Sequence, residues 1–325
     1  ISGSGQLEVG TGPIRTGVTA ILPHEGNIYQ DRPCTAVHII NAYGKSTGLP
    51  QIEELGHLET PILLTGTLSV WNAANTMVDY IAEANPGLTT VNPVVGECND
   101  GYLNDILGRH IGPEHVLDAL ANASNSEISE GNVGAGVGMT GFGWKGGIGS
   151  SSRIVTGEFF DHTIGVLVLT NTGSPEEFRI DGIPVGRELT PQMIKEPDGS
   201  IMIIVATDAP MTSRQLGRVA KRAGFGLARA GGTASHGSGD FVIAFSNGHR
   251  ISPSGRRSCS PESFIPEPEL SRFFSATIDA TEEAIINSIL KAETLTGRDG
   301  NTRVGIPIDR VREIIKLNSR NNAGG

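Results

Sequence analysis

Ser200 is the residue whose surroundings best suit covalent chemistry. It follows Gly199 and begins the apolar run of residues 200–207 (SIMIIVAT), which is typical of a strand covered on both faces. Glycine tolerates the strained backbone in which the next residue's hydroxyl attacks the preceding carbonyl. Cleavage of this bond would give Ser200 an α-amine with a pKa of about 7.7–8.0, which is partly neutral, and so a base, at pH 7. The pattern fits a nucleophile made N-terminal by self-cleavage, although a plain junction between loop and strand fits it too.

A second serine, Ser46, lies in a Gly-x-Ser-x-Gly segment, residues 44–48 (GKSTG), that follows a predicted strand. A nucleophile elbow needs a helix directly after it, and an Asp and a His later in the chain. Three histidines are available downstream: His162, His236 and His249. An elbow-type serine esterase using Ser46 is therefore an alternative, and an ordinary glycine-flanked turn is the simpler interpretation.

Residues 131–149 contain nine glycines, and residues 136–141 match the Gly-x-Gly-x-x-Gly pattern of dinucleotide-binding loops. That fingerprint directly follows a strand, whereas a polar stretch, residues 121–130, precedes this one. A structural loop or an active-site wall is the better interpretation. The sequence has no His-Glu-x-x-His motif, and His110 and His115 would lie on different helix faces. We therefore expect neither a metal nor a cofactor.

The composition argues against several classes of partner. The 325 residues include 25 Lys and Arg against 35 Asp and Glu, a net charge of −10 with no basic run, which disfavours nucleic acid. The longest apolar run, residues 201–206, is far shorter than the ~18 residues of a membrane span, so no membrane contact is expected. The three cysteines form no Cys-x-x-Cys pair. With no signal peptide visible from Ile1, the cytoplasm or the periplasm is the expected location.

Strand-like and helical segments alternate along the chain, which indicates an α+β or α/β layered architecture. The expected strands are residues 36–40, 153–160, 164–170, 200–207 and 241–246. The expected helices are residues 70–84, 113–123, 213–222 and 281–294, and one after Pro307. Polar breaks rich in Pro and Gly are expected at residues 191–199 and 247–268.

Several segments, in order along nearly the whole chain, resemble the self-processing family that includes L-aminopeptidase/D-esterase enzymes and β-peptidyl aminopeptidases. They are residues 12–23 (GPIRTGVTAILP), 51–56 (QIEELG), 97–105 (ECNDGYLND), 131–134 (GNVG), 145–149 (KGGIG), 198–200 (DGS), 236–240 (HGSGD) and 280–284 (ATEEA). The resemblance implies a four-layer αββα sandwich, similar to N-terminal-nucleophile hydrolases but with distinct connectivity. It also implies one domain, residues 1–325, self-cleaved into residues 1–199 and 200–325, and a tetramer of processed heterodimers.

The same resemblance implies roles for individual residues. Ser200 is the expected nucleophile, exposed by cleavage after Gly199, and Ser238 and Asp240 are expected to orient and polarise it. Some β-peptide-cleaving members carry Glu at the position of Asp240. Asn171 is the expected oxyanion-hole amide. The residues expected to bind the substrate's free amine are Glu97, Asn99 and Tyr102.

We therefore predict a serine aminopeptidase or amidase/esterase. Its substrates would be short peptides, amides or esters of L-, D- or β-amino acids with a free N-terminal amine. A non-catalytic assembly protein of the same fold is a further alternative, and the presence of Ser200, Ser238 and Asp240 together argues against it.

Overall fold

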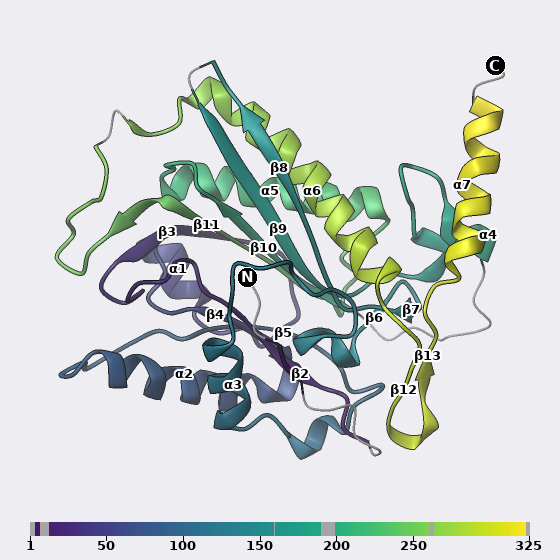
Figure 1. Ribbon diagram of the computed structural model, residues 1–325, viewed down its shortest axis with the longest axis horizontal. Coiled ribbons are helices and arrows are strands. Elements are labelled where there is room, and N and C mark those ends of the chain that lie inside the picture. The colour runs from purple at the N-terminus through teal and green to yellow at the C-terminus, as the bar shows by residue number, and fades with distance from the viewer. Residues whose placement is uncertain (1–3, 7–12, 159, 190–198, 261–262, 323–325) are drawn as a thin grey trace.

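Two stacked β-sheets form the centre of the computed structural model, which describes residues 4–6, 13–158, 160–189, 199–260 and 263–322 (Figure 1). The four-stranded sheet contains, in spatial order, β1 (Ser4–Gln6), β2 (Gly17–Ile21), β4 (Ile62–Gly66) and β5 (Val94–Cys98). The five-stranded sheet contains, in spatial order, β3 (Arg32–Ala42), β11 (Gly239–Ile251), β10 (Ser200–Thr207), β9 (Asp161–Asn171) and β8 (Ile148–Thr156). Its central strand β10 runs parallel to β11 and antiparallel to β9.

Helices cover the outer face of each sheet (Figure 1). Those on the four-stranded sheet are α2 (Val70–Ala84) and α3 (Pro113–Ala121), and those on the five-stranded sheet are α5 (Ser213–Ala230) and α6 (Leu270–Leu290). The predicted four-layer αββα sandwich is thereby confirmed. The smaller elements are α1 (Leu49–Leu55), β6 (Thr140–Gly141), β7 (Trp144–Lys145), α4 (Val185–Leu189), β12 (Leu295–Thr296), β13 (Thr302–Arg303) and α7 (Ile308–Asn322).

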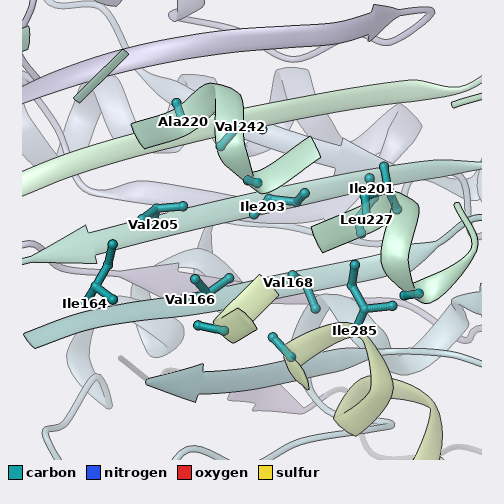
Figure 2. Close-up of a cluster of buried hydrophobic side chains, with 14 of the residues drawn as sticks. Ile164, Val166, Val168, Ile201, Ile203, Val205, Ala220, Leu227, Val242 and Ile285 are labelled. Carbon is teal, nitrogen blue, oxygen red and sulfur yellow. The ribbon is translucent and has the colours of Figure 1, made fainter. Parts of the chain in front are cut away.

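Apolar side chains fill each of the three spaces between the four layers. Between the five-stranded sheet and its helices, side chains of β9, β10 and β11 meet α5 and α6, and those labelled in Figure 2 are Ile164, Val166, Val168, Ile201, Ile203, Val205, Ala220, Leu227, Val242 and Ile285. Between the two sheets lie, among others, Leu64, Cys98, Leu169, Met202, Ile204 and Phe241. Under the four-stranded sheet lie, among others, Val18, Leu63, Val95, Met77 and Val116.

Strand β10 contributes to two of these cores, because its side chains alternate between them. Ile201 and Ile203 face the helices, whereas Met202 and Ile204 face the other sheet. The predicted strand over residues 200–207, buried on both faces, is confirmed, and so is the helix over residues 70–84. The first residue of β10, Ser200, is thus held by a central strand that is buried on both faces.

Both helices on the five-stranded sheet are longer than predicted. Helix α5 continues past Gly224, its predicted end, and stops at Gly231, where φ is 104°. A Cβ at Gly226 would lie 2.6 Å from the carbonyl oxygen of Ile278 in α6, so glycine permits a close helix contact that offsets its low helix propensity. Thr281, the predicted N-cap, lies inside α6, where its hydroxyl donates to the carbonyl of Thr277 at 2.7 Å.

Other boundaries also shift. Strand β8 ends at Thr156 and β9 begins at Asp161, so the turn comes before the predicted position at residues 161–162. Strand β11 runs on to Ile251, past the start of the break predicted from residue 247. Residues 191–198 of the other predicted break lie outside the described residues. Across the described part of the chain, no helix has the length and apolar character needed to cross a membrane.

Candidate active site

Ser200 lies directly between the predicted oxyanion residue and the glycine that separates Ser238 from Asp240. In the five-stranded sheet, Asn171 at the end of β9 pairs with Ser200 on one side, and Gly239 at the start of β11 pairs with it on the other. Ser200 is buried, and its Oγ accepts a hydrogen bond from the backbone N–H of Gly239 at 3.2 Å. A donor directed at this oxygen favours its more negative, attacking form.

Gly199 has no room for a side chain. A Cβ at this position would lie 2.5 Å from the carbonyl oxygen of Asn171 and 2.6 Å from the Cα of Thr172. Only glycine therefore lets the backbone before Ser200 lie against the end of β9. The Gly199–Ser200 peptide bond is in this way kept beside Asn171.

Ser238 and Asp240 form a buried pair on either side of Gly239. The Ser238 hydroxyl donates to Oδ1 of Asp240 at 2.7 Å, so the shorter Asp reaches its partner without the extra methylene of Glu. Burial raises the pKa of Asp240 to about 6, although hydrogen bonds from the Ser238 hydroxyl and the Ile201 N–H oppose the shift. The pair connects to Ser200 through the N–H of Gly239, the residue between its two members.

A polar side chain from β3 fixes the segment before β11. The Nδ2 of Asn41 donates to the carbonyls of Ser235 and His236, at 3.0 and 3.1 Å, and also to that of Ser238. The N–H of Tyr43 donates to the same Ser238 carbonyl at 3.2 Å. These hydrogen bonds from β3 and the residue after it fix the backbone that carries Ser238.

The side-chain amide of Asn171 has a defined orientation. The backbone N–H of Thr140 donates to Oδ1 of Asn171 at 2.8 Å, and because a backbone N–H can only donate, the acceptor must be the amide oxygen. The Nδ2 group is then the end of this amide that can donate. A fixed N–H donor beside a nucleophile is what an oxyanion hole requires.

Glu97 in β5 is a buried carboxylate held by neutral donors. Its Oε1 accepts from the backbone N–H of Lys45 at 2.8 Å, and its Oε2 accepts from the hydroxyl of Thr67. Only 2% of Glu97 is exposed, and a buried charge is costly unless it is paired. A cationic amine of a substrate would supply the matching charge.

A short segment joins Glu97 to the neighbourhood of Ser200. A Cβ at Gly239 would lie 2.7 Å from the carbonyl oxygen of Tyr43, and a Cβ at Gly44 would lie 3.2 Å from Oε1 of Glu97. Residues 43–45 therefore touch the partner of Ser200 at one end and Glu97 at the other. The sheet that carries Glu97 and the sheet that carries Ser200 meet at this segment.

The other two predicted amine-binding residues are placed differently. Asn99 is exposed, and its Oδ1 accepts from the N–H of Gly101 at 2.9 Å, which closes a local turn. The ring of Tyr102 lies 3.8 Å from the guanidinium carbon of Arg303. Their roles toward a substrate remain predictions.

Ser46, the alternative nucleophile, makes its hydrogen bond to sulfur. Its hydroxyl donates to the Sδ of Met202 at 3.7 Å. Of the downstream histidines, His162 contacts Asp208 at 3.2 Å and His249 contacts Cys259 at 3.2 Å. These contacts do not assemble an elbow-type triad around Ser46.

Sequence reasoning missed several residues that hold the site together. Thr140 and Thr67 fix Asn171 and Glu97; Thr67 belongs to no recognisable motif, and Thr140 is a variable position of the glycine pattern at residues 136–141. The importance of Lys145 could have been inferred from the sequence, because it is the only charged residue in the glycine-rich residues 131–149. Within the described parts of the chain, His, Cys, Asp and Glu side chains form no group of three or more that could hold a metal ion.

Comparison with known proteins gives one family. The model of peptidase family S58 matches residues 3–303. Among curated relatives, the β-peptidyl aminopeptidase BapA of Sphingosinicella microcystinivorans is 41% identical, over 97% of this chain and 84% of its own.

Solved structures agree with this assignment. The PH0078 protein of Pyrococcus horikoshii OT3 has a TM-score of 0.89 at 50% identity, over 98% of this chain and 90% of its own. The L-aminopeptidase D-Ala-esterase/amidase of Ochrobactrum anthropi has a TM-score of 0.83 at 29% identity, over 98% of this chain and 96% of its own. The latter is described as a prototype for the serine aminopeptidases and as a new variant among the Ntn hydrolase fold.

Proposed function

Since the chain belongs to peptidase family S58 and is a serine aminopeptidase of that family, we propose that Ser200 is its nucleophile. The observation that carries this assignment is the position of Ser200 between Asn171 and Gly239, with its Oγ held by the Gly239 N–H at 3.2 Å. Ser238 and Asp240 polarise this site, and the Nδ2 of Asn171 stabilises the oxyanion.

We propose that Ser200 first acts on its own chain. Its Oγ attacks the carbonyl carbon of Gly199, the C–N bond breaks, and the chain becomes an ester at Oγ with a free α-amine on Ser200. Water then hydrolyses the ester, which leaves a carboxylate on Gly199 and restores the hydroxyl. The α-amine serves as the base in later turnovers.

The two products of this cut share one sheet. Strands β3, β8 and β9 come from residues 1–199, whereas β10 and β11 come from residues 200–325. Strand β10 pairs along its whole length with β9, from the other product. The five-stranded sheet would therefore hold the processed chains together as one folded unit.

The proposed substrates are short peptides, amides or esters with a free N-terminal amine. The buried Glu97, bonded by neutral donors, supports binding of that amine as a cation. Because a relative with 41% identity is a β-peptidyl aminopeptidase, β-amino-acyl compounds belong among the first substrates to test. L- and D-amino-acyl amides complete the panel.

Glu97→Gln tests this mode of binding. Loss of one charge-assisted hydrogen bond, worth about 1.5–3 kcal/mol, should lower kcat/KM on amino-acyl amides about 10- to 100-fold. Self-cleavage should proceed normally, because no substrate amine takes part in it. Steady-state kinetics and intact-mass analysis measure the two effects separately.

N-acetylated substrates are the matched control. They lack the cationic amine, so the wild-type enzyme should not turn them over. Brisk hydrolysis of these compounds would overturn the aminopeptidase assignment for this site and favour a general amidase or the Ser46 esterase.

The activity should depend on the ionisation of Asp240. Protonation of the Ser200 α-amine, the proposed base, already lowers kcat/KM about tenfold per pH unit below its pKa of about 7.7–8.0. Because burial raises the pKa of the Asp240 carboxyl to about 6, the fall should steepen to about a hundredfold per pH unit below that value. Titration of Asp240 would not by itself unfold the protein. Its folded-state pKa lies above the ordinary value of 3.8, so the fold takes up a proton as the pH drops through about 6, and the contribution of this group to stability rises.

A pair of variants identifies the group. Burial also raises the pKa of Asp100 to about 6, which makes Asp100→Asn the matched control for Asp240→Asn. The steepening near pH 6 should persist in the first variant and be missing from the residual activity of the second, which keeps only the limb of the α-amine. Steepening that persists in Asp240→Asn would assign the second titration to another group.

We also propose a tetramer of processed heterodimers in the cytoplasm or the periplasm. Large apolar side chains remain exposed on the single chain, among them Trp71, Leu117, Ile154 and Phe225, and they suit burial between subunits. Cys34, Cys98 and Cys259 are free thiols. Native mass spectrometry would report the assembly.

A further inference from the structure

Lys145 is a fully buried cation inside the glycine-rich segment. None of its surface is exposed, and its Nζ donates to the backbone carbonyls of Gly136, Met139 and Gly146 at 2.9, 2.9 and 2.6 Å. A lysine ammonium has three donors, so each donor has a carbonyl acceptor. The ammonium ties the turn before β6 to the chain after β7.

One of these carbonyls leads directly to the proposed oxyanion donor. The carbonyl of Met139 and the N–H of Thr140 belong to the same planar peptide group. The oxygen of this group accepts from Lys145, and its N–H donates to Oδ1 of Asn171 at 2.8 Å. A single peptide unit therefore separates the ammonium from the amide of Asn171.

We propose that Lys145 is a positioning residue that acts on the oxyanion through the Met139–Thr140 peptide and Asn171. The proposal rests on the proposed function of Asn171. A cation at a carbonyl oxygen makes the N–H of that peptide a stronger donor, because hydrogen bonds in a chain polarise one another. The Thr140 N–H then holds Oδ1 more firmly, and the Nδ2 hydrogens become better donors toward the developing negative charge.

The surroundings of Lys145 are built to admit this charge. A Cβ at Gly136 would lie 2.5 Å from the carbonyl oxygen of Gly131, and a Cβ at Gly146 would lie 2.6 Å from that of Thr170. Glycine at these positions lets the backbone close around the ammonium. This segment is the one for which the sequence predicts a structural loop or an active-site wall. Burial opposes the charge and lowers the pKa of Lys145 to about 7, whereas the three carbonyl acceptors stabilise the charged form.

The ammonium has a structural role that must be separated from a catalytic one. Its removal leaves the carbonyls of Gly136, Met139 and Gly146 without this donor, and a buried carbonyl that loses its partner costs stability. The position of the ammonium at one end of a path to Asn171 adds a reason that is specific to catalysis.

Lys145→Met is the direct test. We expect kcat on amino-acyl amides to fall by about tenfold, less than the ~10²–10³-fold typical of losing an oxyanion donor outright, with KM within about twofold of wild type. Processing should slow by a similar factor, because the same donor serves both reactions. Turnover is measured on the cleaved fraction, quantified by intact mass.

A double-mutant cycle separates this role from a merely structural one. If Lys145 acts through Asn171, Lys145→Met should add almost nothing to kcat once Asn171 is alanine. Phe178→Leu is the matched control, because Phe178 packs against Phe142 and Trp144 of the β6–β7 hairpin, with ring centroids at 4.9 and 6.0 Å, but lies outside the path. It should lower Tm without lowering kcat.

Two results would overturn the proposal. One is that the losses from Lys145→Met and Asn171→Ala multiply, and the other is that Phe178→Leu lowers kcat as much as Lys145→Met. Lys145→Gln makes the same predictions if the methionine variant does not fold, since its amide can still donate to a carbonyl in the pocket. If Asn171→Ala itself leaves kcat unchanged, the proposed function of Asn171 is what fails.

Discussion

Ser200→Ala is expected to yield one uncut chain with no detectable aminopeptidase activity. The substitution removes the hydroxyl that we propose attacks Gly199 and then serves as the nucleophile of turnover. Wild-type protein should give two chains whose masses match residues 1–199 and 200–325. Intact-mass analysis of freshly purified protein, followed by assay on amino-acyl amides, measures both effects.

The folded structure should survive this change. Alanine leaves the Gly239 N–H without the acceptor that it has at 3.2 Å, which costs about 1–3 kcal/mol, while β10 keeps its two apolar faces. Circular dichroism and Tm therefore serve as folding controls. A Ser200→Ala chain that still splits after Gly199 would show that self-cleavage does not depend on Ser200.

Ser46→Ala is the companion variant. Its hydroxyl contacts only a thioether among the partners that the structure gives it, so cleavage and turnover should match wild type. Loss of activity in this variant with normal activity in Ser200→Ala would instead establish the elbow-type esterase. Wild-type protein that stays intact and inactive would support the non-catalytic assembly protein.

Asn171→Ala is expected to lower kcat about 10²–10³-fold, equivalent to about 3–4 kcal/mol of transition-state stabilisation. The loss should fall on kcat with little change in KM, because the oxyanion develops only in the transition state. Processing should slow in parallel, since attack on Gly199 passes through the same kind of tetrahedral intermediate. Pre-steady-state and steady-state kinetics on cleaved enzyme test this split.

Asn171→Asp distinguishes the donor from the shape of the side chain. A carboxylate of the same size still accepts from the Thr140 N–H, a contact of 2.8 Å in the wild type, but it offers no donor and places negative charge near the oxyanion. Its activity should therefore be no higher than that of Asn171→Ala. Near-normal kcat in Asn171→Asp would assign oxyanion stabilisation to other groups.

Much of the central architecture could be predicted from local pattern. The apolar run at residues 200–207 gave the central strand, and the helical spacing at residues 70–84 gave α2 with its observed ends. Errors came where tertiary contact overrides a local signal. Gly224 and Thr281 look like a helix stop and a helix start, yet both lie inside helices. Helix α5 continues through Gly224 to its close contact with α6 at Gly226, and Thr281 lies at that contact inside α6.

The predicted site residues came from motifs and a family resemblance, and the structure shows which of them meet. Strand register brings Asn171 and Gly239 beside Ser200. Along the chain, Asn171 lies 28 positions before Gly199, the residue that precedes Ser200. Ser238 and Asp240 were predictable as a pair, because residues two apart on an extended chain lie on one side. Asn99 shares a motif with Glu97 but is exposed, since the chain turns after β5.

The sequence by itself determined the layered fold class and the Gly-Ser junction at the start of a buried strand. These follow from local preferences, which are properties of short segments, whereas the expected roles of the site residues came from the resemblance to the family. Only the tertiary structure decided that Thr140 orients Asn171, that Lys45 and Thr67 hold Glu97, and that Lys145 lies at the centre of a glycine-rich turn. The contacts of Asn171 and Glu97 join segments 30 or more positions apart in the chain, and their geometry is fixed by sheet register and by the close packing of the layers, which no single segment encodes.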